Sequence, residues 1–201
     1  LVAQKAIRFL AEHSSEKERV NIVFYGGEPL LEFELLEKCV LYAENLFSKK
    51  DVCFYMTTNG TLLFSDVVDF IVAHNIQLTI SLDGPREVHD RNRHFANSDK
   101  GSFDTLMERL CYIKDTYPQF YRNNIRFNSV LSTEFSFSCS DIFYKEDGLL
   151  EDSIVSLSGI SPSFRKDHVA VEEGYIKEEQ YEYFKLFLAM LGKIDVKYIS
   201  P

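Results

Sequence analysis

Cysteine is scarce in this sequence, and its few copies are scattered. It occurs at four positions, Cys39, Cys53, Cys111 and Cys139, and no two of them form a C-x-x-C pair. Zinc fingers and iron–sulfur sites need closely spaced thiolates, so this spacing gives no recognisable zinc or cluster motif, and no metal ligand is predicted. We interpret the four thiols as small buried hydrophobes of a protein kept in the reducing cytoplasm.

The sequence also lacks long apolar runs and an excess of basic residues. No stretch is long enough to cross a bilayer, and no signal-peptide pattern begins at Leu1, so no membrane partner is expected. The formal net charge is −9 and no basic stripe offsets it, which weighs against a module that binds DNA or RNA. An initiator methionine is missing and a helical pattern begins at once, which indicates a piece of a longer protein.

What the sequence does have is enough apolar material for a sizeable core. Hydrophobic residues make up 45% of the chain and aromatic residues 14%, which weighs against wholesale disorder. A length of 201 residues suits one large domain better than two small ones.

Short β-rich runs alternate with stretches of helical periodicity. The predicted strands are Val20 to Tyr25, Val52 to Thr57, Gln77 to Leu82, Ile125 to Leu131 and Ser153 to Leu157. The predicted helices are Val2 to His13, Leu31 to Phe47, Ser65 to about Ala73 with Ser65 as N-cap, one opened by Gly101 and Ser102, a short one around Ser140 to Tyr144, and Glu178 to Leu191. A polar loop is predicted from Arg86 to Lys100. Strands separated by helices imply parallel pairing, so the expected fold class is α/β.

Unusual polar residues follow three successive predicted strands. The segments are Gly26-Gly27-Glu28-Pro29, Thr58-Asn59-Gly60, and Ser81 with Asp83-Gly84-Pro85. In parallel sheets and barrels, active groups collect at the C-terminal ends of the strands, so these segments are expected to share one rim.

Each segment also has an ordinary explanation. The glycine pair is typical of a tight strand-to-helix turn, and Glu28 of a carboxylate in the first turn of a helix. Asn-Gly and Asp-Gly-Pro are common turn sequences, and Arg93 lies in a stretch that reads as a solvated loop. Both explanations stay open for every one of these residues when it is taken alone.

Taken together, the groups would complement a free amino acid. Glu28 could accept hydrogen bonds from an ammonium group, while Ser81 and a bidentate Arg93 could hold a carboxylate. Gly26 and Gly27 would let backbone N–H groups approach such a ligand closely.

Three stretches carry a resemblance to a known family. "FYGGEPLL", "TTNGTLL" and "SLDGPREVHDRNR" resemble successive motifs of the radical S-adenosylmethionine (SAM) enzymes. They are most similar to the branch with a SPASM or twitch extension, which includes anaerobic sulfatase maturases and thioether-forming peptide maturases. The resemblance covers about Val2 to Leu131 and weakens past Ser132. There "DIFYKEDGLLEDSIVSLSGIS" is more similar to the variable region of maturases of Cys-rich peptides.

This resemblance implies a fold and an activity. The fold would be a partial (β/α)6 TIM-like barrel without its first strand. It would form one domain over residues 1–201, with a well-matched core at 1–131 and a variable final strand and helix region at 132–201. The full-length protein would bind SAM beside a [4Fe-4S] cluster and cleave it reductively to a 5′-deoxyadenosyl radical. That oxidoreductase-like chemistry would modify a peptide or protein substrate.

The resemblance also implies roles for particular residues. The methionine amino group would be bound by Gly26, Gly27, Glu28 and Pro29. Ribose and the methionine carboxylate would be bound by Ser81 and Arg93, with Asp83 in the same motif counted as cofactor-binding. The remaining members of the expected site are Thr58 and Asn59 on the rim, and Asn128 and Val130 beside the adenosine. No motif marks a catalytic acid or base.

One departure from the family pattern concerns activity. The C-x-x-x-C-x-x-C segment that supplies three thiolates to the cluster is absent. In the family it lies upstream of the helix that begins here at Val2, so the chain is expected to be an inactive core fragment. Its cluster ligands would belong to the full-length protein.

Two further readings stay open. The parent could be a degenerate, cluster-free barrel that acts as a peptide-binding or scaffold module. It could also be an ordinary metal-independent barrel enzyme, which would need an acid–base pair that the sequence does not show. Whichever of the three hypotheses holds, an incomplete barrel exposes a strand edge, so we expect a homodimer through that edge or a C-terminal segment that covers it.

Overall fold

The fold was analysed in a computed structural model, which describes residues 2–96, 98–131, 137–151, 153–159 and 173–195. Parts of the region that resembles the family weakly, among them 132–136 and 160–172, lie outside the described residues. The chain divides into two compact units. Unit 1 comprises Leu1–Ile80 and Glu108–Ile125, and unit 2 comprises Ser81–Met107 and Arg126–Pro201. The expectation of a single domain stays a prediction.

Every predicted strand is present, with small shifts at the ends. The strands are β1 (Arg19–Phe24), β2 (Asp51–Thr58), β3 (Gln77–Ser81), β4 (Ile125–Leu131) and β5 (Ile154–Gly159). They follow one another in the order β1-β2-β3-β4-β5 in a five-stranded sheet. The pairs β1–β2, β2–β3 and β4–β5 are parallel. The predicted α/β class with parallel pairing is therefore confirmed.

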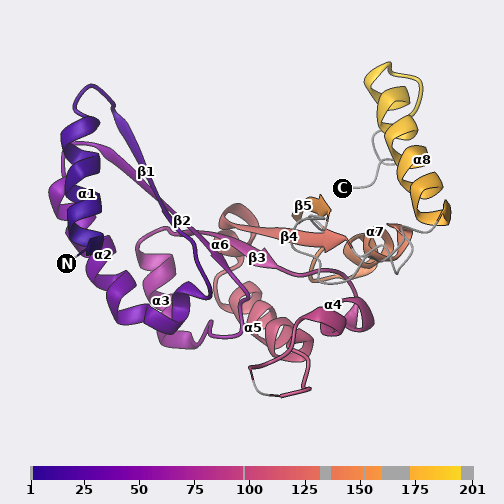
Figure 1. Ribbon diagram of the computed structural model, residues 1–201, viewed down its shortest axis with the longest axis horizontal. Helices are drawn as coiled ribbons and strands as arrows, with labels where there is room; N and C mark the ends of the chain where they lie inside the picture. The colour runs from indigo at the N-terminus through magenta and orange to yellow at the C-terminus, as the bar shows by residue number, and fades with distance from the viewer. Residues whose placement is uncertain (1, 97, 132–136, 152, 160–172, 196–201) are drawn as a thin grey trace. The chain divides into compact units, whose positions relative to one another are not determined.

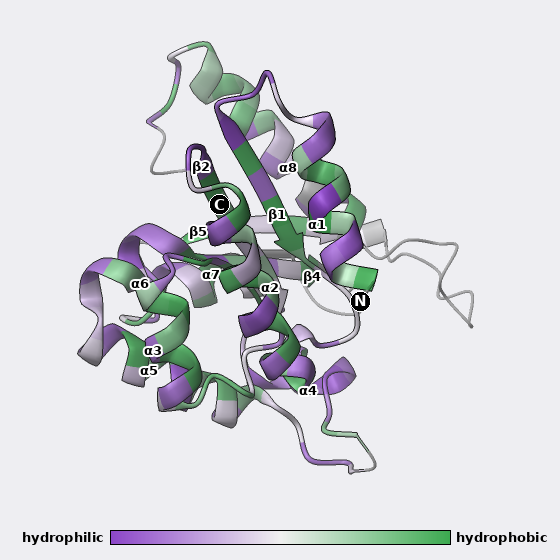
Figure 2. Ribbon diagram, turned by 90° about the vertical axis from the view of Figure 1, so that its left-hand side faces the viewer, coloured by the Kyte–Doolittle hydropathy of each residue, from purple (hydrophilic) through white to green (hydrophobic). Residues whose placement is uncertain are grey.

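In unit 1 the side chains of a strand alternate between more and less buried positions, and the helices bury apolar side chains along one of their faces. Val20 of β1 is buried while Asn21 and Val23 are exposed. In Figure 2 the start of β1 changes between hydrophilic and hydrophobic colours, and its end is hydrophobic throughout. β2 buries Phe54 and Met56 by the same period of two. Helix α1 (Val2–His13) packs on α2 (Phe33–Leu46), and α2 contacts β2 (Figure 1).

The other helices are the 3₁₀ helix η1 (Pro29–Glu32), α3 (Ser65–Ala73), α4 (Arg86–Asn92), α5 (Phe103–Thr116), α6 (Pro118–Asn124), α7 (Phe137–Glu146) and α8 (Glu173–Met190). They lie at or near their predicted positions, except for α4 and α6, which were not predicted. The N-cap of α3 is the extended residue Phe64, whose side chain cannot cap. The prediction of Ser65 as N-cap is therefore wrong, because Ser65 already lies inside the first turn.

The prediction of a polar loop from Arg86 to Lys100 is wrong for its first half, which forms α4. Charged residues cover most of this short helix, so its sequence lacks an apolar stripe. Val88 and His89 are nevertheless buried, and Pro85 at the N-cap position holds the extended backbone from which the helix starts. Helix α6, which begins with Pro118, was not predicted either, because its seven residues, PQFYRNN, are too few to show an apolar stripe.

Unit 2 has its own buried centre. Phe127 of β4 is fully buried, as are Leu106 of α5 and Leu150 after α7. Tyr144 of α7 packs with its ring centroid 6.1 Å from that of Phe127. Helix α7 confirms and lengthens the short helix that was predicted there, and α8 begins earlier than the predicted Glu178.

None of the helices in the described part of the chain combines the length and the apolar character that a membrane span requires.

Candidate functional site

The loop after β1 leaves its two glycines beside open space. A Cβ atom built on Gly26 or Gly27 would meet nothing within 4 Å. Neither residue has a positive φ, in contrast to Gly60 and Gly84. Neither packing nor backbone conformation therefore demands glycine at these two positions, and the open side could be filled by atoms from outside the chain.

Glu28 joins this loop to the end of β2. It is the N-cap of η1, where its Oε1 accepts a hydrogen bond from the Leu30 N–H at 3.1 Å. The same oxygen accepts from the Thr58 hydroxyl at 2.7 Å, and Oε2 accepts from the Asn59 N–H at 2.7 Å. Pro29 follows in the first turn of η1, where its missing N–H costs nothing. The helix-start explanation of Glu28 is therefore confirmed, although it describes only part of what the side chain does.

The carboxylate of Glu28 is not saturated. A carboxylate offers about four lone-pair sites, and the described contacts use two on Oε1 and one on Oε2. One acceptor site on Oε2 remains. The side chain is only half-buried, so a further donor can reach it.

Thr58 and Asn59 support Glu28 by forming a tight turn. Thr58 is buried, and its hydroxyl accepts from the Gly60 N–H at 3.0 Å while it donates to Glu28. The Asn59 side-chain oxygen accepts from the N–H and the hydroxyl of Thr61 at 2.9 and 2.8 Å. Gly60 has a φ of +75°, which favours glycine. The turn explanation of this segment is confirmed, and the turn directs two donors at Glu28.

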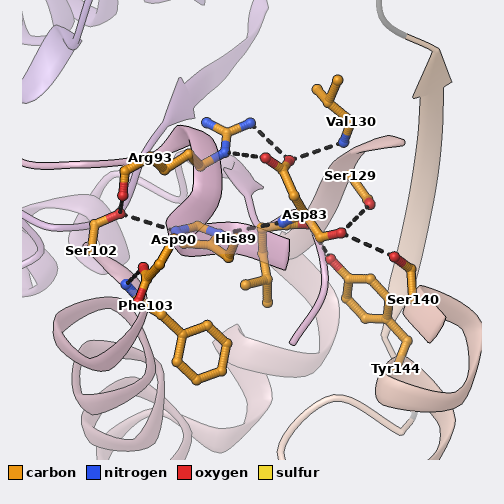
Figure 3. Close-up of polar contacts among 11 residues, drawn as sticks. Asp83, His89, Asp90, Arg93, Ser102, Phe103, Ser129, Val130, Ser140 and Tyr144 are labelled. Carbon is orange, nitrogen blue, oxygen red and sulfur yellow. Dashed lines mark hydrogen bonds and ion pairs between the residues drawn. The ribbon is translucent and has the colours of Figure 1, made fainter. Parts of the chain in front are cut away.

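In unit 2, Asp83 and Arg93 form a bidentate ion pair (Figure 3). Arg93 donates from Nε to Asp83 Oδ2 at 2.6 Å and from Nη2 to Oδ1 at 2.9 Å. The Val130 N–H donates to the same Oδ1 at 2.9 Å. Asp83 is 5% exposed, and Arg93 is the C-cap of α4. Formation of α4 thus brings Arg93 back onto the loop that follows β3.

The backbone of the Asp83 loop is held as firmly as its side chain. The Asp83 carbonyl accepts from the Ser129 and Ser140 hydroxyls at 3.0 and 3.1 Å, and the preceding carbonyl, of Leu82, accepts from the Tyr144 hydroxyl (Figure 3). Burial raises the pKa of Tyr144, so its hydroxyl stays protonated and can donate.

The fold requires a glycine at position 84 of this loop. Its φ is +142°, and a Cβ there would lie 2.8 Å from Ser140 Oγ. The glycine therefore lets α7 approach the loop closely enough for the Ser140 hydroxyl to reach the Asp83 carbonyl.

His89 closes the network on the side of α4. Its Nδ1 accepts from the Asp83 N–H at 3.3 Å, so the proton of the neutral ring lies on Nε2, which faces Ser102 Oγ at 3.0 Å. The Ser102 hydroxyl in turn donates to the Arg93 carbonyl at 3.2 Å. Burial lowers the pKa of His89 to about 4, which keeps the imidazole neutral near pH 7.

The remaining expected residues lie around this network. Ser81 is the last residue of β3, and its half-buried hydroxyl has no hydrogen-bond partner within the described ranges. The Asn128 carbonyl accepts from the Leu82 N–H at 3.0 Å, and its side-chain oxygen accepts from the Ser158 hydroxyl at 3.0 Å. Val130 takes part through its backbone N–H.

The structure thus forms two clusters, one in each unit. Unit 1 brings together Glu28, Thr58 and Asn59, and unit 2 brings together Asp83, Arg93 and Val130. The sequence did not point to the buried residues that hold Arg93 and the loop around Asp83 in place, which are His89, Ser102, Ser129, Ser140 and Tyr144. They are recognised only because they lie close together in the folded structure. The histidine that follows a valine shortly after "DGP" was a weak sequence signal for one of them, His89.

No group of three or more His, Cys, Asp or Glu side chains that could hold a metal ion occurs among the residues that the structure describes. The four cysteines are all free thiols, but the interpretation of them as buried hydrophobes is right only for Cys39, because Cys53 and Cys139 are half-buried and Cys111 is exposed. These side chains therefore do not fit the iron–sulfur cluster, and they are assigned no part in binding one.

No family model matches the chain, but individual proteins with similar sequences include radical SAM enzymes. The chain is 27% identical over 154 residues to the radical SAM cyclopropyl synthase TigE of Paramaledivibacter caminithermalis, a match that covers 76% of the chain and 30% of TigE. It is 32% identical over 96 residues to the cysteine-type anaerobic sulfatase-maturating enzyme of Clostridium novyi, covering 47% of the chain and 25% of that enzyme.

Solved structures share the fold. The structure of native anSMEcpe with bound AdoMet and Kp18Cys peptide superposes with a TM-score of 0.74 at 17% identity, over 96% of this chain and 53% of that one. The chain thus spans between about a quarter and about half of the lengths of these proteins. The resemblance carried by the three strand-end motifs is confirmed.

Proposed function

We propose that this chain, a relative of the radical SAM maturases, is the SAM-binding part of an enzyme that modifies a peptide or protein. The observation that carries the proposal is the similarity over 76% of the chain to a radical SAM cyclopropyl synthase. The fold shared with anSMEcpe supports it, since that structure holds both AdoMet and a peptide.

The cluster in unit 1 would bind the ammonium group of the methionine moiety. Glu28 has one free acceptor site on Oε2, and an ammonium group is a strong charge-assisted donor. Open space beside Gly26 and Gly27 leaves room for the ligand, and Pro29 fixes the backbone that follows. Thr58 and Asn59 would act by orienting Glu28, because their donors are directed at its carboxylate.

The cluster in unit 2 would bind the carboxylate and the nucleoside. The two Nη1 donors and the second N–H of Nη2 of Arg93 have no partner among the described residues, and they match the geometry of a carboxylate. The free hydroxyl of Ser81 suits ribose. The side-chain amide of Asn128 could donate to adenine, whereas Val130 would contact it without its N–H, which Asp83 already holds.

Bound SAM together with a [4Fe-4S] cluster supplies the radical chemistry of these enzymes. The residues of this chain would contribute binding and orientation of SAM. None of the four cysteines has the C-x-x-x-C-x-x-C spacing, so we propose that the 201 residues alone do not cleave SAM and that the thiolates are supplied from elsewhere in the protein.

The test uses the protein in its natural length, purified without oxygen. We expect the absorption of an iron–sulfur cluster and the formation of 5′-deoxyadenosine when a reductant is added, whereas these 201 residues alone should give neither. A protein of natural length that binds a peptide but shows no cluster absorption and no 5′-deoxyadenosine would overturn the enzymatic proposal. It would instead support the peptide-binding or scaffold module.

Partners and compartment follow from the same proposal. The substrate would be a peptide or protein, and the cytoplasm is the compartment that suits four free thiols. A homodimer through the edge of β1 is proposed as well, because β1 stands at one end of the strand order and Val23 on it is 60% exposed.

A further inference from the structure

Asp83 is built to hold another side chain, and little of it is left for a ligand. Both of its carboxylate oxygens accept from Arg93, and Oδ1 also accepts from the Val130 N–H. At 5% exposure it is the most deeply buried carboxylate among the described residues with an ion-pair partner. Arg93, by contrast, keeps a quarter of its side chain exposed.

We propose that Asp83 is a positioning residue. It fixes the guanidinium of Arg93 so that the terminal N–H groups face a carboxylate, and it thereby makes the protein prefer ligands that carry the α-carboxylate of an amino acid. This inference rests on the proposed function, in which Arg93 binds that carboxylate.

The geometry explains how the fixing works. Asp83 occupies the Nε edge of the guanidinium, so only the edge formed by Nη1 and the free N–H of Nη2 can accept a second carboxylate side by side. The backbone of Arg93 is also held, because its N–H donates to the His89 carbonyl at 3.1 Å and its own carbonyl accepts from Ser102. Both ends of the arginine are therefore fixed, and a long flexible side chain keeps one orientation.

Asp83 in turn has no freedom to follow the arginine. Its N–H donates to His89, its carbonyl accepts from Ser129 and Ser140, and its side chain accepts from Val130 (Figure 3). These contacts come from α4, β4 and α7, so three elements of unit 2 determine where the carboxylate lies.

The charge of Asp83 makes the direction of the change in ligand affinity informative. Asp83 and a ligand carboxylate are both negative, so their direct interaction is repulsive. If Asp83 acted on the ligand through its charge alone, Asp83→Asn would tighten binding. If Asp83 acts by orienting Arg93, the same substitution weakens binding, because the asparagine amide cannot accept both arginine donors and the Val130 N–H as the carboxylate does.

The experiment compares SAM with decarboxylated SAM, which keeps the sulfonium, the nucleoside and the amino group. Their dissociation constants are measured calorimetrically on the protein in its natural length. We expect the wild type to bind SAM at least about tenfold more tightly than decarboxylated SAM. Asp83→Asn should raise the dissociation constant of SAM about tenfold and change that of decarboxylated SAM by less than about twofold.

Three outcomes overturn specific statements. Equal weakening of both ligands would mean that Asp83 only supports the fold, and unchanged or tighter SAM binding would mean that it does not position Arg93. A wild type that binds neither ligand would instead refute the proposed function. If Asp83→Asn fails to fold, Asp83→Glu replaces it, with the same expected loss of preference because the longer side chain displaces the guanidinium.

The chain offers a matched control. Arg86 and Asp104 form a second bidentate pair, but it is exposed, with side-chain exposures of 51% and 62%. Asp104→Asn should leave both dissociation constants unchanged. In an Arg93→Ala background, Asp83→Asn should have no further effect on the preference for SAM, since its influence passes through the arginine.

Discussion

At the scale of single residues, Glu28 shows how one carboxylate can have a structural and a binding role together. Three donors of the chain hold it in place, and one acceptor site is left. We expect Glu28→Gln to lower the free energy of unfolding by about 1–2 kcal/mol, because the amide presents donors to other donors in a half-buried site. It should also weaken SAM binding at least about tenfold.

Urea unfolding and calorimetric titration measure the two effects of Glu28→Gln. Glu34→Gln is the control, since Glu34 is 88% exposed and pairs with Lys38 on the surface of α2. Thr58→Val separates the roles further, because it removes one donor to Glu28 and leaves the charge in place. Loss of stability in Glu28→Gln with unchanged SAM binding would refute the ammonium contact.

The two kinds of glycine in the candidate site predict opposite results. Gly27 faces open space without a positive φ, so Gly27→Ala should leave the free energy of unfolding unchanged or raise it by up to about 1 kcal/mol. If SAM fills that space, the same variant binds SAM more weakly. Gly84→Ala should instead destabilise by about 2 kcal/mol or more, because its φ is +142° and a Cβ would crowd Ser140. Thermal melts with and without SAM measure both, and a Gly27→Ala protein that binds SAM normally would remove the glycine pair from the site.

His89 predicts how stability depends on pH. Its pKa is about 4 in the folded protein and about 6.5 in an unfolded chain. Between these values the unfolded state binds a proton that the folded state does not, so the free energy of unfolding decreases as the pH falls from about 7 to about 4. The loss from this one group is up to about 3 kcal/mol. Urea midpoints across this range should therefore fall less steeply in His89→Gln, and equal slopes in the two proteins would contradict the assignment.

At the scale of elements, the sequence predicted the strands and helices that show apolar periodicity, and it missed a helix that is held by polar contacts. The strands of buried residues such as Phe54, Met56 and Phe127 were recognisable, and with them the parallel α/β class. Helix α4 was not, because charged residues dominate it and it is stabilised by the contacts of His89 and Arg93 with the Asp83 loop. These contacts are between polar side chains and a loop, and no apolar periodicity in the sequence marks them.

The same limit applies to the candidate site. The sequence identified Glu28 and Asp83 as noteworthy because they follow strand ends, and Arg93 because it lies in a stretch that resembles a family motif. It could not tell that Asp83 and Arg93 pair with each other, or that Thr58 and Asn59 face Glu28. The sequence suggested which residues could belong to the site, whereas only the folded structure shows which of them hold the others in place.

The start of α5 carries a prediction of its own. Asp90 accepts a hydrogen bond from the Phe103 N–H at 2.9 Å and thus caps this helix from α4, and a Cβ on Gly101 would lie 2.0 Å from its Cγ. Asp90→Ala should lower the free energy of unfolding by about 1 kcal/mol. It should leave the preference for SAM over decarboxylated SAM unchanged, since Asp90 does not contact Arg93. Chemical denaturation and the two titrations check these expectations, and a lost preference would show that the cap also serves the site.

At the scale of the whole molecule, the position of β1 at one end of the strand order predicts self-association. Val23 is 60% exposed on a strand at the end of the sheet order, and such edges pair with other strands unless they are protected. We expect light scattering to show a dimer of the 201-residue chain, and Val23→Lys to shift it toward the monomer. A chain that is monomeric at every concentration tested would rule out the edge as an interface.

The hydrogen bonds around Asp83 also have a consequence for amide exchange. The N–H groups of Asp83, Arg93 and Val130 donate to His89 Nδ1, the His89 carbonyl and Asp83 Oδ1, and two of these three acceptors are buried side chains. The Asp83 and Val130 amides can exchange with deuterium only when the contacts of the loop after β3 with α4 and β4 open, whereas the Arg93 amide is bonded within α4 and can also exchange when that helix end frays. The exchange rates of Asp83 and Val130 should therefore be alike, although the two residues lie far apart in the sequence. The Asp83 loop would then behave as one cooperative unit whose opening can be followed without any ligand.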